Sequence, residues 1–109
     1  MSETFCLQWN EFKPNAFSML SSARENKEYV DLTLACEDGQ QMEAHKVILA
    51  SSSPFFENIL QKNKHPHPLI YFANFKSYDM DALLDIVYLG EAKVDQEHLG
   101  SFLAPAEHI

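Results

Sequence analysis

The chain has 109 residues, of which 46% are hydrophobic, and it carries eight phenylalanines, four tyrosines and one tryptophan. A chain of this length forms one domain with its own hydrophobic core and needs neither a disulfide nor a metal to fold. Sixteen acidic residues against eight basic ones give a net charge of −8. This balance argues against direct nucleic-acid binding and against an anionic membrane surface, since both depend on lysine and arginine.

The cysteines and the N-terminus indicate a reducing compartment. Cys6 and Cys36 each lie in an apolar stretch typical of a strand, so we interpret both as reduced, buried small hydrophobes. Residues 1–4 lack the basic region and apolar run of a signal peptide. No apolar stretch approaches the ~20 residues of a membrane span. We therefore expect a cytosolic or nuclear protein.

The first predicted element is a strand over residues 4–9, where Phe5, Leu7 and Trp9 alternate with Cys6 and Gln8. This segment precedes every part of the chain that could form a core. A strand in that position must add to the edge of a sheet or to another chain. The alternative is that its aromatic side chains cover the core of their own domain.

Residues 14–109 form the predicted body of the domain. Pro14 is tolerated in the first turn of a helix. After that helix, strands over residues 29–37 and 40–45 flank the hairpin signal Asp38-Gly39. The helix with Pro14 in its first turn has four apolar residues at helical spacing: Ala16, Phe17, Leu20 and Ala23.

Two short helices and a third strand follow the hairpin. Residues 47–50 predict an apolar helix, and Ser53 and Pro54 suit the N-cap and first position of another. Residues 69–72, rich in branched and aromatic side chains, predict the strand.

The strongest helical pattern runs from Ser77 and is closed by Gly90. A small strand over residues 91–94 and a last helix complete the chain, and we expect that helix to break or kink at Pro105. The fold class is mixed α/β, dominated by helices.

Five stretches, in their order and spacing, resemble a BTB/POZ domain over nearly the whole chain, residues 5–109. They are residues 5–10, 30–34, 44–50, 53–56 and 88–91. The N-terminal Phe-Cys-Leu-Gln-Trp-Asn run and the pair His67-Pro68 resemble the insect tramtrack-type subgroup.

The resemblance implies helices clustered around a small three-stranded sheet and an obligate dimer built on the first helix. In this chain the dimer residues would be Ala16, Phe17 and Leu20. Domains of the tramtrack type assemble further through the N-terminal strand, which here comprises Phe5, Cys6, Leu7, Gln8 and Trp9.

The resemblance also implies a biological setting. Such domains usually begin nuclear proteins that carry zinc fingers or another DNA-binding module and regulate transcription or chromatin. The expected partners are the chain itself, other BTB proteins and corepressor or architectural proteins. We expect no direct nucleic-acid contact by this domain and no membrane, and we interpret the chain as a domain excised from a longer protein.

Asp31 and Lys46 match a charged pair that lines a pocket at the dimer interface of the family. The alternative is an ordinary solvated acid and base, which would contribute only about 0–1 kcal/mol. We favour the buried pair, in which removal of one partner would leave a costly orphaned charge.

Neither a metal site nor catalysis is expected. His65 and His67 are close in sequence but lack the further ligands that zinc needs, and we interpret His45 as a hydrogen-bonded structural residue at the start of its helix. Residues 51–53 are all serine, yet no nucleophile elbow or phosphate-binding loop accompanies them. The serines are interpreted as helix caps, and we expect no cofactor.

A second hypothesis is a substrate adaptor for a cullin-type ubiquitin ligase, another role of this fold. Such adaptors carry a hydrophobic-x-acidic element near the helix after Pro54 and a helical extension behind the domain. Residues 56–58 offer no clear match, and the extension is absent from this chain. Oligomerisation of a DNA-binding regulator is therefore the favoured function.

Overall fold

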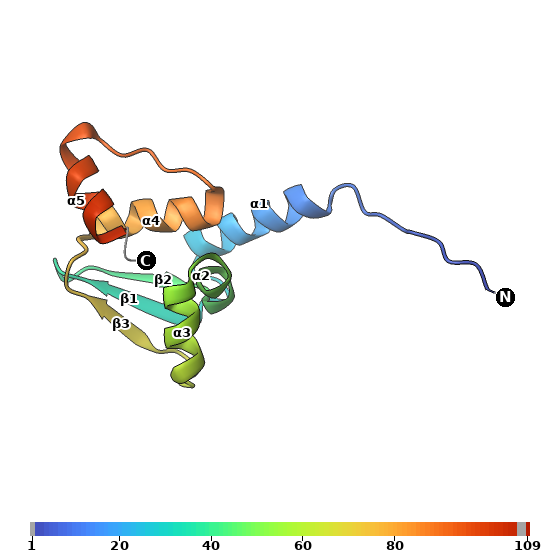
Figure 1. Ribbon diagram of the computed structural model, residues 1–109, viewed down its shortest axis with the longest axis horizontal. Coiled ribbons are helices and arrows are strands. Elements are labelled where there is room, and N and C mark those ends of the chain that lie inside the picture. The colour runs from blue at the N-terminus through green and yellow to red at the C-terminus, as the bar shows by residue number, and fades with distance from the viewer. Residues whose placement is uncertain (1, 107–108) are drawn as a thin grey trace.

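The structure, a computed structural model, describes residues 2–106 and 109. Within this range the chain forms five helices and three strands that cluster into one body, from which the N-terminal segment extends (Figure 1). The elements are α1 Phe12–Glu25, β1 Leu32–Cys36, β2 Gln41–Ala44, α2 Lys46–Ser52, α3 Pro54–Lys62, β3 Leu69–Phe72, α4 Ser77–Leu89 and α5 Gln96–Ala106. The predicted class, mixed α/β with helices dominant, is confirmed.

The three strands form one mixed sheet in the order β2-β1-β3. β1 pairs antiparallel with β2, with Leu34 opposite Met42, and parallel with β3, with Leu34 opposite Ile70. The hairpin turns at Gly39, whose φ of 86° belongs to the left-handed region that glycine adopts without strain. β2 and β3 lie on opposite sides of β1, so the chain between them must pass from one edge of the sheet to the other, and this connection contains α2 and α3.

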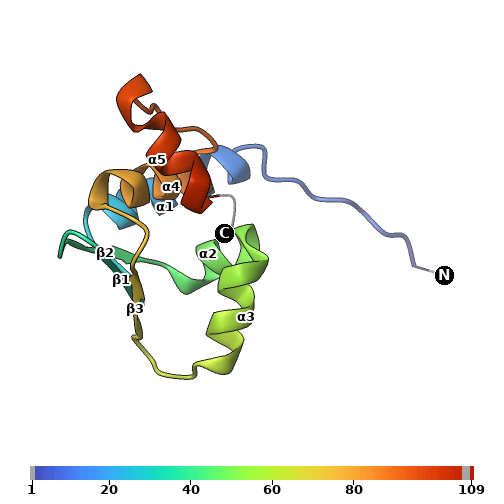
Figure 2. The ribbon, with the colours of Figure 1, turned by 60° about the vertical axis from the view of Figure 1, so that its left-hand side comes forward.

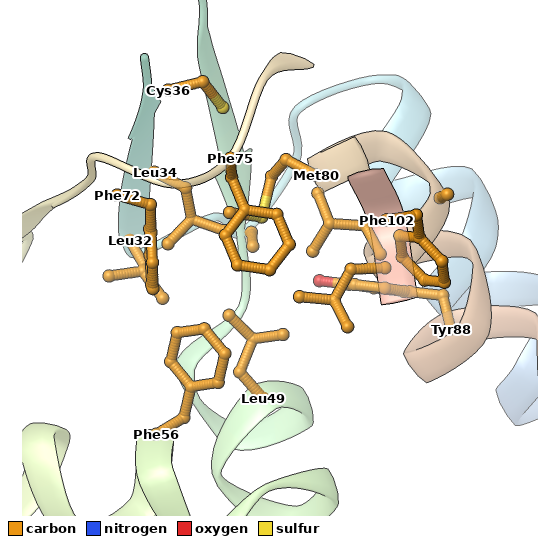
Figure 3. Close-up of a cluster of buried hydrophobic side chains, with 14 residues drawn as sticks. Leu32, Leu34, Cys36, Leu49, Phe56, Phe72, Phe75, Met80, Tyr88 and Phe102 are labelled. Atoms are coloured by element: carbon orange, nitrogen blue, oxygen red, sulfur yellow. The ribbon is translucent and has the colours of Figure 1, made fainter. Parts of the chain in front are cut away.

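The core lies between one face of the sheet and the helices (Figure 3). β1 buries alternate residues, as a half-buried strand must. Helices α2 and α3 bring Leu49 and Phe56 to the core, and α4 brings Met80 and Leu84. Aromatic rings from three segments pack beside them: the Phe72 ring lies 5.8 Å from the tilted ring of Phe56 and 5.7 Å from Phe75, which it meets edge to face.

Local signals set several helix ends. Ser53 caps α3, because its Oγ accepts a hydrogen bond from the Phe56 amide at 3.4 Å, and Pro54 is the first residue of that helix. Gly90 ends α4 with a φ of 84°. Pro14 lies in the first turn of α1, where its missing N–H would have had no partner. All three predictions are confirmed.

Other details differ from the predictions. Residues 4–9 and 91–94 form no strand in the described chain, because neither has another strand to pair with. A strand is defined by its partner, and alternation alone does not supply one. Helix α5 does not break at Pro105 but continues to Ala106, so the proline falls in its last turn.

Asp38 links the hairpin turn to the start of α4. Its Oδ2 accepts hydrogen bonds from Ser77 N–H at 3.0 Å and from Ser77 Oγ at 2.7 Å. These bonds to Ser77, with smaller contributions from nearby backbone amides, hold the pKa of the Asp38 carboxyl below its usual value.

We expect the contribution of Asp38 to stability to disappear in acid. Its pKa is lower in the folded state than the ~3.9 of an unfolded aspartate, so the contribution is present above that value and is lost as pH falls through the folded pKa. The free energy of unfolding should therefore be lower for Asp38→Ala than for the wild type at neutral pH, and the two values should become equal in acid. Glu37→Ala, at the neighbouring exposed acid, is the matched control. A difference that stays constant down to acid pH would contradict this linkage.

Candidate protein interaction surface

Helix α1 exposes most of its apolar side chains. Phe12, Phe17 and Met19 are 56%, 61% and 50% exposed, whereas Ala23, near the C-terminal end, is the one buried residue of α1. Figure 1 shows why: only the C-terminal part of the helix lies against the body, beside α4, and the N-terminal part projects outward. A helix with so much uncovered apolar surface is typical of an interface.

The N-terminal arm, residues 2–9, continues this exposed surface. Phe5, Leu7 and Trp9 are 76%, 93% and 61% exposed. The arm runs away from the body in both views (Figures 1 and 2). Its one described anchor is local: the Phe12 amide donates to Trp9 O at 3.1 Å, and the two rings lie 5.6 Å apart. Covering the core of its own domain, the alternative use of these residues, is wrong for the described chain.

Arg24 attaches the C-terminal end of α1 to α4. Its two terminal nitrogens lie 3.0 Å from Asp81 Oδ1 and 2.9 Å from Asp85 Oδ1, and the guanidinium stacks 5.2 Å from the centroid of Tyr88. The Arg24 side chain is only 15% exposed. A planar guanidinium can make both kinds of contact at once, so this residue sets the position of α1 on the body.

A buried hydrogen-bond network lies next to this attachment. The His45 amide donates to Tyr88 Oη at 2.9 Å, and His45 Nε2 lies 2.8 Å from the carbonyl oxygen of Glu28. Because a carbonyl only accepts, Nε2 carries the proton, and Nδ1 accepts from the Tyr88 hydroxyl at 2.6 Å. Burial raises the pKa of Tyr88, which keeps that hydroxyl protonated. The prediction that His45 is a structural residue is confirmed.

The same network holds the turn that leaves α1. Lys27 and Tyr29 both have positive φ, at 56° and 61°, a conformation that costs residues other than glycine free energy. The bond from His45 to Glu28 O fixes the middle of this turn. The direction of the chain between α1 and β1 is therefore determined by a tertiary contact.

Asp31 and Lys46 lie side by side, but their charged groups do not meet. Asp31 Oδ1 accepts a hydrogen bond from the Lys46 amide at 2.7 Å at the start of α2, while Lys46 Nζ donates to the carbonyl oxygen of His65 at 2.7 Å. Both residues are half-buried. In the single chain Asp31 therefore accepts a backbone hydrogen bond at the start of α2, and the ammonium group of Lys46 holds the loop before β3.

The histidine loop has structural contacts. His67 Nε2 is 2.8 Å from Thr33 Oγ1, and the His67 amide donates to His65 Nδ1 at 2.9 Å.

A surface cluster that was not predicted from the sequence comprises Asp95, Glu97 and His98, whose ligand-type atoms lie within 4.8 Å of one another. It sits at the N-terminus of α5, where the helix dipole disfavours a cation.

Of the three serines of residues 51–53, only Ser53 is a helix cap, so the prediction of caps is wrong for Ser51 and Ser52, which lie in the last turn of α2. The hydroxyls of Ser51 and Ser52 donate to the carbonyl oxygen of Ile48 at 3.0 and 2.8 Å, and Ser53 caps α3. Ser53 Oγ also donates to Ile109 O at 3.0 Å.

Among the described helices, none combines the length and apolar character needed to cross a membrane.

The two cysteines occupy opposite environments, which corrects the prediction that both are buried. Cys36 is buried in β1, whereas Cys6 is exposed on the N-terminal arm. Burial, followed by the nearby Asp38 and Asp79 charges, raises the pKa of the Cys36 thiol. A smaller fraction of Cys36 is therefore ionised to the reactive thiolate.

We expect Cys36 to resist alkylation in the folded protein. In a Cys6→Ser variant, iodoacetamide should modify Cys36 much more slowly in buffer than in denaturant, because the thiol is both buried and protonated. Mass spectrometry of the alkylated chain measures both rates. Equal rates in the two conditions would show that β1 opens readily.

Comparison with known proteins identifies the class. The BTB/POZ domain family model matches residues 20–109. The chain therefore belongs to the BTB/POZ family, which is a family of protein-interaction modules and not of enzymes. The BTB domain of zebrafish PATZ1 superimposes with a TM-score of 0.81 at 19% identity, covering 96% of this chain and 86% of that one, and so confirms the fold.

Relatives from Drosophila melanogaster place the chain in the insect subgroup of BTB domains. The sex determination protein fruitless is 42% identical over 109 residues, all of this chain but 11% of the relative. The alpha isoform of tramtrack is 38% identical over 108 residues, 99% of this chain and 13% of the relative. Longitudinals lacking protein-like is 37% identical over 107 residues, 98% of this chain and 84% of the relative. The chain thus spans a small part of two of these proteins and most of the third.

Proposed function

We propose that this domain assembles copies of itself, as the oligomerisation module of a nuclear regulator of transcription or chromatin. One observation carries the proposal: the arm and α1 together expose large apolar side chains on the part of the molecule that projects from the body. They are Phe5, Leu7, Trp9, Phe12, Phe17 and Met19. Contiguous exposed apolar surface of this kind is typical of interfaces.

The assembly has two parts in this proposal. A symmetric dimer forms through α1, where Phe17 is exposed and Ala16 and Leu20 are half-buried. The arm then joins a strand of another copy, because an extended segment with a free backbone adds readily to an open sheet edge. Phe5, Leu7 and Trp9 would lie on one side of that strand, and Cys6 and Gln8 on the other.

The charged residues would complete the dimer interface. Asp31 and Lys46 are half-buried in the single chain and belong to the turn and helix that adjoin the end of α1. A partner that covers them would raise the cost of leaving either charge unpaired. We therefore keep this pair as the proposed charged pocket of the dimer.

Self-association would serve DNA binding indirectly. The acidic charge of −8 is unsuited to phosphate contacts. An oligomer can instead link several DNA-binding modules and raise their effective concentration near one another. Fruitless and tramtrack, of which the chain covers about a tenth, leave ample length for such modules. Other BTB proteins and corepressor or architectural proteins are the further proposed partners.

Light scattering of the purified domain tests the proposal. We expect a mass above that of a dimer at micromolar concentration, and deletion of residues 1–10 should reduce it to the dimer. The matched control exchanges the three arm side chains Phe5, Leu7 and Trp9 for serine, which keeps the length but removes the apolar contacts. A monomeric wild type would refute self-association, and an unchanged mass after the deletion would refute the role of the arm.

A further inference from the structure

The outer edge of β2 carries unpaired backbone groups. β2 ends the sheet order β2-β1-β3, so one of its edges has no neighbouring strand. The Cys36 amide donates to Gln40 O at 2.9 Å, and hydrogen-bonded positions in an antiparallel pair recur at every second residue. Met42 therefore turns its backbone toward β1, whereas Gln41 and Glu43 turn theirs outward. Outside the sheet ladder, no described hydrogen bond involves the backbone of Gln41 or Glu43.

A cleft of about 400 Å³ adjoins this edge. Its walls are β2, the C-terminal end of α1 and the outer side of α4, which lie together in Figure 1. The half-buried Met42 and Leu89, which is 58% exposed, supply its apolar surface. An open strand edge beside an apolar cleft offers an incoming strand both backbone hydrogen bonds and a place for its side chains.

The charge of the cleft specifies the kind of strand. Four carboxylates and two cations line it: Glu25, Glu43, Asp81, Asp85, Arg24 and Lys27. Arg24 is already paired with Asp81 and Asp85. The described ion pairs include none of Glu25, Glu43 and Lys27, so the four carboxylates outnumber the two cations and the cleft presents a net negative charge to an incoming chain.

We propose that the β2 edge and this cleft bind an extended basic segment of a partner protein, which adds to the sheet as a fourth strand. Its cationic side chains would face Glu43 on one side of the sheet, its apolar side chains would contact Met42 and Leu89 on the other, and Glu25 would add to the negative charge around the strand. This site is separate from the exposed face of α1 and does not depend on the proposed oligomer.

Other occupants fit less well. If the β2 strand of a second copy paired so that Glu43 lay opposite its own counterpart, the two like charges would disfavour the pairing. The arm of a second copy, residues 2–9, contains one acidic residue and no basic one. Charges on an edge strand can also serve only to prevent aggregation, but that role requires no apolar cleft beside them.

The test uses the isotope-labelled domain and a short peptide of alternating lysine and valine. Titration followed by NMR should shift the amides of Gln41, Glu43 and Leu89 saturably. A peptide with glutamate in place of lysine should not bind. A lysine–valine peptide with N-methylated valines should bind weakly, because it lacks the backbone donors that a strand contributes.

Two variants separate the site from general charge attraction. Glu43→Lys and Glu25→Lys should each weaken binding about tenfold or more. The matched control Glu91→Lys changes the same charge at an exposed acid outside the cleft and should bind like the wild type. Equal loss in all three variants, or equal binding of the N-methylated peptide, would overturn the proposal. Hydrogen exchange gives a further test. If the amides of Gln41 and Glu43 are protected without peptide and lose that protection when residues 1–10 are deleted, the arm of another copy occupies the edge, and the proposal is overturned.

Discussion

Phe17→Glu should dissociate the proposed dimer. Phe17 is 61% exposed in the single chain, at the middle of α1. Burying a carboxylate where an aromatic ring was buried costs an interface about 2–4 kcal/mol per copy. A symmetric dimer contains the change twice, so the dissociation constant should rise by about three orders of magnitude or more. Analytical ultracentrifugation over a concentration series measures this.

The control for Phe17→Glu is Tyr71→Glu. Tyr71 is 55% exposed on β3, away from α1 and the arm, so the same kind of change should leave the mass unaltered. An obligate dimer can lose its fold when it dissociates. Circular dichroism of each variant, and the milder Phe17→Ala, therefore distinguish a dissociated domain from an unfolded one. A folded Phe17→Glu that stays dimeric at nanomolar concentration would show that α1 is not the interface.

Local patterns were enough to predict most of the fold. The alternation of Leu32, Leu34 and Cys36 fixed the buried face of β1, and Asp38-Gly39 fixed its turn. Each of these features acts over a few residues, so it is visible in sequence. Residues 91–94 show the limit of such patterns: a small strand was predicted there, but no described strand lies beside them.

The contacts that position α1 were not visible in sequence. Arg24 pairs with Asp81 and Asp85, which lie 57 and 61 residues further along the chain. His45 was expected to be hydrogen-bonded, but its partner Tyr88 is 43 residues away. An arginine or a histidine in a helical stretch is compatible with many partners, and only the packing of α4 against α1 selects one. The interface role of Ala16, Phe17 and Leu20 was expected only from the resemblance to a known family.

The cleft beside β2 illustrates the same point. Glu43 and Glu25 lie in different elements, and their charges in sequence indicate ordinary solvated positions. Only the sheet order leaves β2 at an edge, and only the attachment of α1 by Arg24 brings Glu25 to it. The arginine attachment therefore affects both surfaces, because it sets the direction of the exposed α1 face and forms one wall of the cleft.

The His45–Tyr88 pair should show strong coupling in stability. His45→Ala removes both ring contacts and leaves a gap in the core, and we expect a loss of about 2–4 kcal/mol in the free energy of unfolding. Tyr88→Phe leaves the buried His45 amide without its partner and should cost about 1–3 kcal/mol. Because Tyr88 contacts His45 at two atoms, the double variant should lose less than the sum, with a coupling of about 0.5–3 kcal/mol. Urea unfolding of the four proteins gives the cycle.

Tyr71→Phe is the matched control for the hydroxyl. Its side chain is half exposed on β3, so water replaces whatever the hydroxyl contacts, and the change should stay within about 0.5 kcal/mol. Additive losses for His45→Ala and Tyr88→Phe would mean that the two residues act independently and that the turn after α1 is held by other contacts. Coupling would instead tie that turn to α4, because the same imidazole that accepts from Tyr88 donates to Glu28 O. The exposed face of α1 would then keep its direction through the buried imidazole of His45.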